Sequence, residues 1–398
     1  MPSTRSVLSL IVALCAALFL GSQTDLRVGI DFSVAVLLGW GLAIVLLKPC
    51  FSTPATLVAA TVLVRLPLLW APPSLSDDLY RYLWEGQVWR AGLNPFVHAP
   101  NAPELAFLRD ALWEKVNHRE ISSIYPPLAQ LSFLALSPFG VFGWKLGMGL
   151  ADVGTAWLLF RRRPEAGSLW ALLPLPVLEA AGSGHLEGLG VMLMVAGLSL
   201  GRGFWGAGLV WAAAMVKLLP ALLLPRVAPR WSWPLWGGAT LGAFWAMGLE
   251  PALFRGFETY RQHWSFNGSL YPLLRFWVEE EAVVRLLLQA TGMGVVAWIV
   301  WRSQDPGRIA LWGCGAFVLL SPTVHPWYVL WALAAGLWCA VDAWLLLGTL
   351  VPLAYLVWGP QGWSEPAWVA PVIYTPVYLR LLWTGLRRLL LPSPSPVF

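Results

Sequence analysis

Long apolar runs separated by short polar segments make up most of the chain. About 20 apolar residues cross a bilayer as a helix, and shorter runs cross when they pack inside a bundle. The pattern therefore predicts an all-α polytopic membrane protein with about fourteen transmembrane helices. They are expected near residues 6–21, 33–47, 54–71, 126–139, 143–160, 168–180, 187–201, 204–224, 234–253, 282–301, 308–321, 327–341, 343–358 and 367–389.

The composition supports this class. Hydrophobic residues make up 58% of the chain and charged residues 12%, which excludes a soluble protein with one anchor. The formal charge of +5 is the usual basic excess of a membrane protein and gives no case for nucleic acid as a partner. The 27 tryptophans suit interfacial belts, and they equally suit a groove for a sugar or a polyprenyl chain.

The cysteines and the N-terminal apolar run do not alter the predicted class of protein. The four cysteines have no C-x-x-C spacing, which argues against a metal cluster or a disulfide framework. Arg5 precedes an apolar run from Val7 to Leu20, as in a signal peptide. We expect an uncleaved first span, because a small-residue cleavage site is missing and further spans follow at once.

The basic residues orient the predicted helices. With the N-terminus inside, the cytoplasmic side receives Lys48, Arg226, Arg230, Arg302, Arg308, Arg387 and Arg388, as the positive-inside bias requires. The triplet Arg161–Arg163 falls outside in this count. Either the triplet marks a cytoplasmic loop and one short run between Pro126 and Gly201 does not cross, or the arrangement of the protein overrides the charge bias.

The stretch from Pro72 to Gln130 concentrates the candidate chemistry. Its first 54 residues hold seven of the 21 acidic residues, between two apolar regions. Asp77 and Asp78 come just after two prolines that end an apolar segment, so they are expected at the membrane interface, partly desolvated. The residues that follow have the spacing of a short amphipathic helix lying on a bilayer.

This stretch resembles a known family. SDDLYRYLWEGQVWRAGLNPF, followed by IYPPLAQ, is similar to the first outward loop of the GT-C superfamily of membrane glycosyltransferases, which use lipid-phosphate-linked sugars. It most resembles bacterial polyprenol-phosphate-mannose-dependent mannosyltransferases and, more distantly, the mannosyltransferase of glycosylphosphatidylinositol anchors. GHLEGLG, MVKLLPALLLP and SPTVHPWYVLW also look like the bacterial group.

The resemblance implies a domain organisation. Residues 1–53 would form N-terminal membrane helices, and residues 54–253 a GT-C-type membrane module. That module would contain an outward catalytic loop at 72–125. A second outward loop at 254–281 and a variable set of helices at 282–398 would follow.

The resemblance also implies a reaction. The enzyme would move a sugar, expected to be mannose, from a polyprenyl-phosphate donor to an acceptor hydroxyl on the extracytoplasmic face, with inversion. Asp78 matches the family's D-x-Y-x-Y pattern and is the expected general base. Asp77 would share its proton, orient the acceptor or help to hold Mg²⁺ or Mn²⁺, although two adjacent acids alone make a weak metal site.

Further residues are candidates for substrate contacts. Tyr80 and Arg81 are expected to contact phosphate or sugar, and Asn94 and Tyr125 to contact sugar hydroxyls, although Asn94-Pro95 is as readily a turn. In the second loop, Arg261 and His263, together with Arg255 and Arg275, would meet a phosphate, the acceptor or anionic lipid headgroups. His325 would donate to the donor phosphate or serve as an interfacial belt residue.

Two other polar positions are harder to place. His185 and Glu187 flank a glycine-rich break between two short apolar runs, and polar groups at such depth are functional candidates. The helix count puts this break on the inner side, away from the aspartates. Lys217 is a similar case: a buried charge would need a partner, and the commoner explanation is a side chain that extends its charge along an apolar surface toward water.

Two other functions fit a polytopic protein. A transporter or flippase of lipid-linked sugars predicts inverted repeats and charges at the midplane, whereas no repeat is evident and the charges cluster at one face. An assembly protein predicts that both aspartates can be replaced without loss. The expected partners of a transferase are the lipid-linked donor, a glycolipid, glycan or protein acceptor, and membrane lipids. The expected location is a bacterial inner membrane with the site facing outward.

Overall fold

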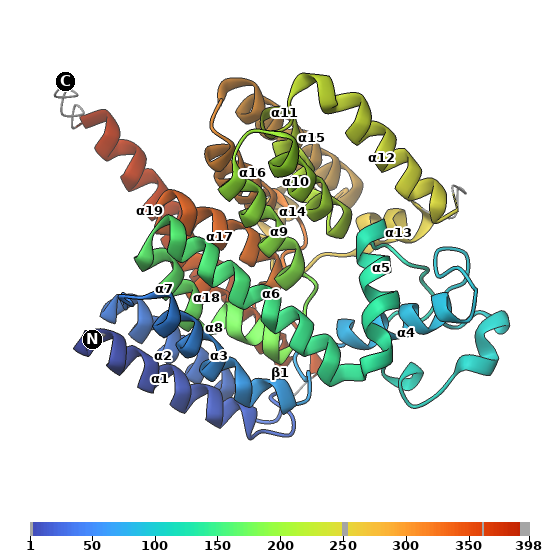
Figure 1. The fold of residues 1–398 in the computed structure, drawn as a ribbon, viewed down its shortest axis with the longest axis horizontal. Helices are drawn as coiled ribbons and strands as arrows, with labels where there is room; N and C mark the ends of the chain where they lie inside the picture. The colour runs from blue at the N-terminus through green and yellow to red at the C-terminus, as the bar shows by residue number, and fades with distance from the viewer. Residues whose placement is uncertain (1–2, 249–253, 360–361, 391–398) are drawn as a thin grey trace.

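The computed structural model describes residues 3–248, 254–359 and 362–390, almost all of which lie in helices or in the loops that join them (Figure 1). The α-helices are α1 (Thr4–Gly21), α2 (Ile30–Leu47), α3 (Pro54–Trp70), α4 (Asp78–Arg90), α5 (Pro127–Leu136), α6 (Gly140–Arg162), α7 (Pro164–Leu172), α8 (Pro174–Val177), α9 (Glu187–Leu200), α10 (Phe204–Val216), α11 (Leu224–Val227), α12 (Trp233–Ala246), α13 (Arg255–His263), α14 (Tyr271–Trp277), α15 (Glu281–Arg302), α16 (Pro306–Leu320), α17 (Val329–Cys339), α18 (Ala343–Leu350) and α19 (Val369–Leu390). Two short strands, β1 (Trp358–Gly359) and β2 (Gly362–Trp363), pair antiparallel.

Proline and capping residues set several helix starts. Thr53 caps α3, whose first residue is Pro54, and Asp305 caps α16 just before Pro306. Proline is tolerated in a first turn, because the N–H that it lacks has no partner there. The same rule accounts for the start of α5 at Pro127, one residue after the start expected at 126.

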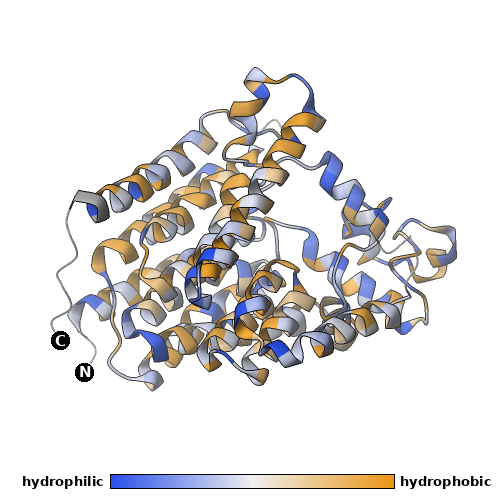
Figure 2. Ribbon diagram, turned by 90° about the horizontal axis from the view of Figure 1, so that it is seen from above, coloured by the Kyte–Doolittle hydropathy of each residue, from blue (hydrophilic) through white to orange (hydrophobic). Residues whose placement is uncertain are grey.

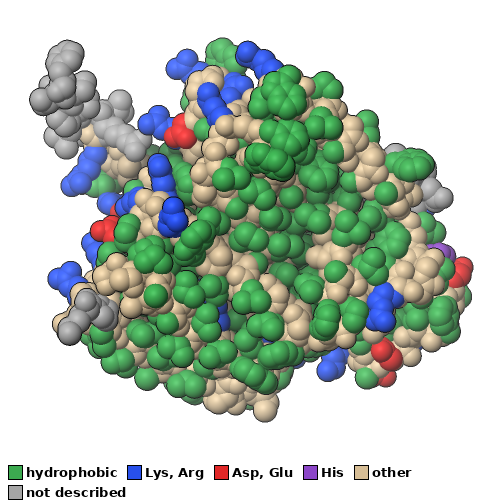
Figure 3. Space-filling model, in the orientation of Figure 1, with side chains coloured by type: hydrophobic (Ala, Val, Ile, Leu, Met, Phe, Trp, Pro, Cys, Tyr) green, Lys and Arg blue, Asp and Glu red, His purple; other side chains and the backbone are tan. Residues whose placement is uncertain are grey.

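The described residues contain four helical runs that are long and apolar enough to cross a membrane by length and composition: α1, α2, the run Pro127–Arg162 and α15. Shorter apolar helices accompany them, and many large apolar side chains are exposed on the outside, such as Leu241, Trp245 and Trp298. Figure 2 shows hydrophobic residues along most of the helices, and Figure 3 shows apolar side chains over much of the visible surface. The prediction of an all-helical membrane protein is therefore confirmed by the secondary structure and by the length and composition of the helices.

The helices run between two ends of the molecule. At one end, the start of α1 meets the α2–α3 loop through Ser6 and Cys50, and the same loop meets α7 where Ser168 accepts from Phe51 N. Arg202 bonds Gln304 at this end. We call it the basic end, because most of the Lys and Arg side chains visible in Figure 3 gather along the corresponding edge. The opposite end, which carries residues 71–126, is called the loop end.

The triplet Arg161–Arg163 lies at the basic end, at the end of α6 that adjoins α7. The start of α6 lies at the loop end, since Lys145 Nζ donates to the carbonyls of Leu68 and Ala71 at the end of α3. One short run between Pro126 and Gly201 therefore does not cross, as in the first alternative, and the triplet lies at the same end of the molecule as Lys48.

The separate crossing expected at 126–139 is wrong. α5 has 10 residues and lies against α4, so it starts at the same end at which α6 starts. Ten residues of α-helix span about 15 Å, too little for a bilayer. The run expected at 204–224 is also divided: α10 ends at Val216, and the chain returns through α11 to the basic end, where Val227 O accepts from Gly203 N.

A buried ion pair joins α3, α6 and α7. Arg65 Nε donates to Asp152 Oδ2 at 2.6 Å, and Trp170 Nε1 donates to Asp152 Oδ1 at 2.7 Å. Arg65 also donates to the carbonyls of Thr61 and Ala171. A buried charge needs such partners, because its desolvation is costly. This network fixes how the helices behind the loop end pack.

Candidate active site

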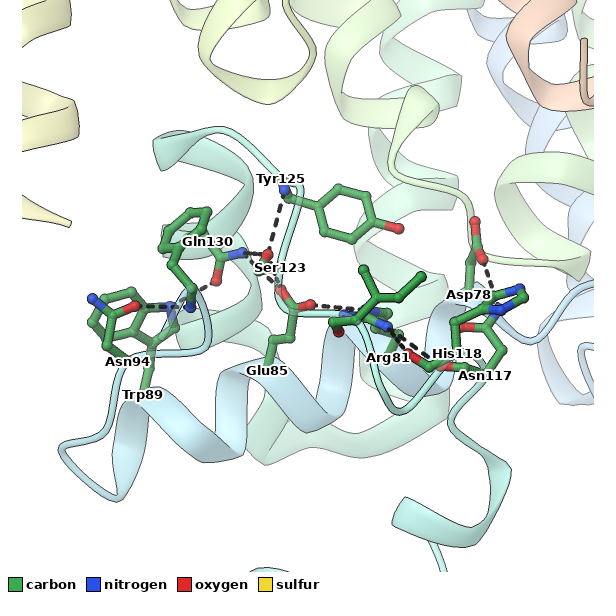
Figure 4. Close-up of polar contacts among 12 residues, drawn as sticks. Asp78, Arg81, Glu85, Trp89, Asn94, Asn117, His118, Ser123, Tyr125 and Gln130 are labelled. Atoms are coloured by element: carbon green, nitrogen blue, oxygen red, sulfur yellow. Dashed lines mark hydrogen bonds and ion pairs between the residues drawn. The ribbon is translucent and has the colours of Figure 1, made fainter. Parts of the chain in front are cut away.

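Asp78 is the first residue of α4, seven residues beyond Ala71, which ends α3. Its side chain is 23% exposed, and its Oδ1 accepts a hydrogen bond of 3.1 Å from Asn117 Nδ2, a residue of the long loop before α5 (Figure 4). Asp77 is the N-cap residue of the helix and is also partly exposed. The pair thus lies where the sequence predicts, just past a helix end and partly desolvated.

Burial raises the pKa of both carboxyls. For Asp78, the hydrogen bond from Asn117 and the cationic Lys217 and Arg81 oppose this rise. For Asp77, Arg27 opposes the rise and the charge of Asp78 adds to it. A carboxylate with a raised proton affinity is a better proton acceptor at neutral pH than an exposed aspartate.

The polar face of the helix after the aspartates is buried inside the protein and not solvated, contrary to the amphipathic pattern predicted. α4 packs against α5, and Arg81 and Glu85 form a buried ion pair of 2.9 Å (Figure 4). Glu85 also accepts from Ser123 and Gln130. The spacing that suggests a solvated polar face instead serves an internal network, because the long loop folds back over that face and supplies its partners.

Arg81 is held by this network. Its guanidinium donates to Glu85 and to the backbone carbonyls of Asn117, His118 and Ile121. Every nitrogen of the guanidinium thus has a partner within the protein, so Arg81 has a structural role in holding the loop. It holds in place the segment that presents Asn117 to Asp78.

A π-helical turn brings a second group of polar side chains to Asp78. The turn spans Leu178–Gly182, and such turns occur often at functional sites. After it, Gly184 adopts a left-handed conformation with φ of +71°, and its carbonyl accepts from Trp144 Nε1 at 2.6 Å. The chain then places His185 Nδ1 4.0 Å from Asp78 Oδ2.

The expected inner location of the His185 break is therefore wrong. The error comes from the extra crossing counted at 126–139. That crossing places every later segment at the wrong end of the molecule, up to the divided run at 204–224. With that crossing removed, the break lies at the loop end. The glycine-rich GHLEGLG sequence correctly predicted a break between two helices, and only the wrong count of helices misplaced it.

His185 is buried and connects several elements. Its Nε2 lies 3.5 Å from Glu179 Oε2, and its ring stacks on Trp327 with centroids 3.8 Å apart. Glu179 Oε1 accepts a bond of 2.6 Å from Tyr355. Neither Glu179 nor Asn117 is marked by any motif, so sequence reasoning missed both.

Lys217 brings a cationic side chain close enough to act on Asp78. It pairs with Glu187, the first residue of α9, and its Nζ lies 3.7 Å from the centroid of the Tyr328 ring. Tyr328 in turn shares a hydrogen bond of 2.8 Å with Tyr260 of α13. Lys217 thus has the partner that a buried charge needs, because the start of α9 and the end of α10 meet, and its side chain remains 30% exposed.

His325 joins the same group. Its ring stacks on Trp327 with centroids 4.4 Å apart, and burial lowers the pKa of His325 to about 3. The imidazole is thus neutral at pH 7. The structure brings His325 within the aromatic group that also holds His185.

Tyr125 and Tyr80 lie near the aspartates as well. The Tyr125 ring packs edge-on against Tyr82 and points its phenol toward the side of Asp78 in Figure 4. Tyr80 is partly exposed and has Lys115 Nζ 5.2 Å from its ring centroid.

Three candidates serve other contacts. Asn94 Oδ1 accepts from Phe96 N, and Asn94 Nδ2 donates to Met247 O. Asn94 therefore forms a turn, which was the alternative to a sugar contact. Arg261 is exposed on α13 and pairs with Glu258, while His263 is exposed and bonds Thr259 O. The structure does not bring Arg261 or His263 into contact with Asp78.

The described residues contain no group of three or more His, Cys, Asp or Glu side chains arranged to hold a metal ion. Asp77 and Asp78 alone do not supply the 6 to 8 oxygen ligands of Ca²⁺ or the near-octahedral set of Mg²⁺ without several waters or substrate oxygens. The residues present therefore do not form a dedicated cation cage.

Replacing Gly184 with alanine is expected to destabilise the protein. A Cβ there would lie 2.6 Å from Leu79 Cδ1, and the left-handed backbone adds about 1–3 kcal/mol of strain. Thermal unfolding of Gly184→Ala should be compared with Gly29→Ala, where φ is also +71° but no atom lies within 4 Å. Equal unfolding temperatures for the two variants would contradict the close packing of the turn against α4.

Comparison with known proteins gives consistent relatives. Residues 9–136 match the family model described as alpha-(1->6)-mannopyranosyltransferase, N-terminal domain. The chain is 29% identical over 72% of its length to alpha-(1->6)-mannopyranosyltransferase A of Mycobacterium tuberculosis, and 24% identical over 67% to alpha-(1->6)-mannopyranosyltransferase B of Corynebacterium glutamicum. A probable alpha-(1->6)-mannopyranosyltransferase of Mycolicibacterium smegmatis is 26% identical over 68%.

The matches cover 65%, 56% and 63% of the lengths of these three relatives. No solved structure matches the chain. The chain is thus similar to bacterial alpha-(1->6)-mannopyranosyltransferases over about two thirds of its length, and the family resemblance drawn from the aspartate loop is confirmed.

Proposed function

We propose that this protein is a membrane mannosyltransferase that transfers mannose from a polyprenyl-phosphate donor to a hydroxyl of a glycan acceptor, forming an alpha-(1->6) linkage. The observation that carries the proposal is Asp78: a partly buried carboxylate held by Asn117 at the loop end, in a chain similar to alpha-(1->6)-mannopyranosyltransferases. The linkage comes from the names of those relatives.

Asp78 acts as the general base. It takes the proton from the acceptor hydroxyl while the acceptor oxygen forms a bond to C1 of the sugar. The bond from C1 to the phosphate oxygen breaks, and its electron pair leaves with the polyprenyl phosphate. Attack from the face opposite the phosphate inverts C1, so a β-linked donor gives an α-linked product. General bases of this kind contribute about 10²- to 10⁴-fold to a rate.

The leaving phosphate needs a cation or hydrogen-bond donors. Lys217 is the best placed, because its side chain is 30% exposed and lies over the ring of Tyr328, whose hydroxyl is hydrogen-bonded to that of Tyr260. Neutral His325 would add a donor. In this arrangement the charge that develops on the phosphate forms next to groups that are already ordered, which limits reorganisation in the transition state.

The loop end faces outward in our proposal. The positive-inside bias supports it, because Arg161, Arg162, Arg202 and Arg226 lie at the basic end, together with Lys48. A polyprenyl-phosphate donor is held by its hydrocarbon chain within the membrane and presents its sugar at the interface, where Asp78 lies.

A transfer assay tests the proposal. Purified protein in proteoliposomes would receive radiolabelled mannose on polyprenyl phosphate or, separately, on GDP, with extracted envelope glycolipids as acceptors. We expect label in an α-linked product from the polyprenyl donor alone. Label that only crosses the membrane of a proteoliposome, with no new glycosidic bond, would overturn the proposal in favour of a transporter.

A further inference from the structure

We propose that Glu179 and His185 form a buried pair that keeps a hydrogen-bond donor, His185 Nδ1–H, directed at Oδ2 of Asp78. The pair acts through Asp78 and is therefore a positioning device. The inference rests on the proposed function, because it assigns a role relative to the proposed base.

The geometry brings three unpaired buried atoms together. Glu179 is fully buried and His185 is 1% exposed, and among the described residues neither ring nitrogen of His185 nor Oε2 of Glu179 has a hydrogen-bond partner. His185 Nε2 lies 3.5 Å from Oε2, and Nδ1 lies 4.0 Å from Asp78 Oδ2. A buried polar atom left unpaired is costly, so these atoms are expected to serve one another. Such contacts are often long before substrate binds and shorten in the complex.

Charge balance decides which nitrogen carries the proton. An ionised carboxylate at the position of Glu179 has the hydroxyls of Tyr355 and Ser183 and the ring of His185 beside it, and none of these carries a charge when the ring is neutral. Burying that charge without a cation is strongly unfavourable. The pair is therefore neutral overall, with Glu179 protonated and donating to Nε2 of a neutral His185. In this state Nδ1 carries the ring hydrogen, and that hydrogen faces Asp78.

This donor has a clear effect on the base. A hydrogen bond to the ionised form stabilises that form, so His185 and Asn117 together oppose the rise that burial imposes on the proton affinity of Asp78. Other charged groups also act on Asp78: Lys217 at the end of α10, Arg81 on α4, His118 in the loop, Glu187 on α9 and the neighbouring Asp77. Lys217 and His325 face His185. Variants of His185 and Glu179 leave all of these groups in place.

The experiment compares three variants by the pH dependence of kcat/KM. His185→Phe retains a ring to stack on Trp327 but has no donor, so its acid limb should move about 1 pH unit higher, because the ionised base becomes harder to form. His185→Asn places an amide donor near the position of Nδ1 and should keep an acid limb close to the wild type. Glu179→Gln mimics the protonated acid and should also keep it.

Each of these outcomes decides something. An unshifted acid limb in His185→Phe would overturn the proposal. So would a loss of more than tenfold in Glu179→Gln, because Glu179 would then have to accept a proton as a carboxylate.

A second measurement is independent of transfer activity. In protein labelled with ¹⁵N-histidine, the ring signal of His185 can be assigned among five histidines by its loss in His185→Asn. We expect a protonated Nδ1 at pH 7 in the wild type and in Glu179→Gln. A bare Nδ1 would refute the pairing even if the protein transferred sugar. Absence of transfer by a wild type that shows a protonated Nδ1 would refute the proposed function and leave the pair itself standing.

Discussion

Asp78→Asn is expected to lower mannosyl transfer by about 10²- to 10⁴-fold, the range that a general base contributes. Asparagine keeps the size of the side chain and can still accept from Asn117, so the loss would come from the missing proton acceptor. The measurement is single-turnover transfer from radiolabelled polyprenyl-phosphate mannose. KM for the donor should change little, because the substitution removes chemistry and not a donor contact.

Two other variants serve as controls for Asp78→Asn. Glu104→Gln removes an exposed acid of the same loop and should transfer at the wild-type rate. Asp77→Asn should reduce the rate by less than Asp78→Asn, since Asp77 is the N-cap residue and does not contact Asn117. If Asp78→Asn keeps more than a tenth of the wild-type rate, Asp78 is not the base.

The pH dependence has a definite sign in this mechanism. Burial raises the pKa of Asp78, so the carboxylate becomes protonated at a higher pH than an exposed aspartate would. Because the base must be ionised, kcat/KM should fall as the pH decreases through that raised pKa.

Arg65→Met is expected to destabilise the protein by about 3–5 kcal/mol, the usual cost of removing one partner of a buried ion pair. Asp152, which is 1% exposed, would keep only its bond from Trp170. The measurement is the unfolding midpoint in detergent, followed by loss of the monodisperse peak in size-exclusion chromatography.

An exposed pair provides the matched control. Arg380 and Asp342 are 38% and 51% exposed, so Arg380→Met should cost no more than about 1 kcal/mol. Adding Asp152→Asn to Arg65→Met should recover part of the loss, because it removes the unpaired charge. Equal midpoints for Arg65→Met and Arg380→Met would show that the buried network does not hold α3, α6 and α7 together.

Composition and hydropathy predicted the all-helical membrane class, and the local sequence placed Asp78 just past a helix end. Both predictions depend on short-range properties: the length of apolar runs, and prolines that end a helix. The same kind of evidence placed the start of α5 within one residue of Pro127.

The partners of Asp78 could not be predicted in this way. Asn117 comes from a loop whose path depends on Arg81 holding three backbone carbonyls. His185 was visible as a polar break, but its side of the membrane depended on whether a ten-residue apolar helix crosses. Hydropathy cannot distinguish a short helix that packs at one end of a bundle from a short helix that crosses it, because both bury apolar side chains.

Since α5 begins and ends on one side of the molecule, residues 71 to 139 form a single insertion between two passes of the chain. Such an insertion can lengthen, shorten or change its surface without turning any later helix upside down. A change in this segment is therefore contained at the loop end, while the helices behind it keep their direction.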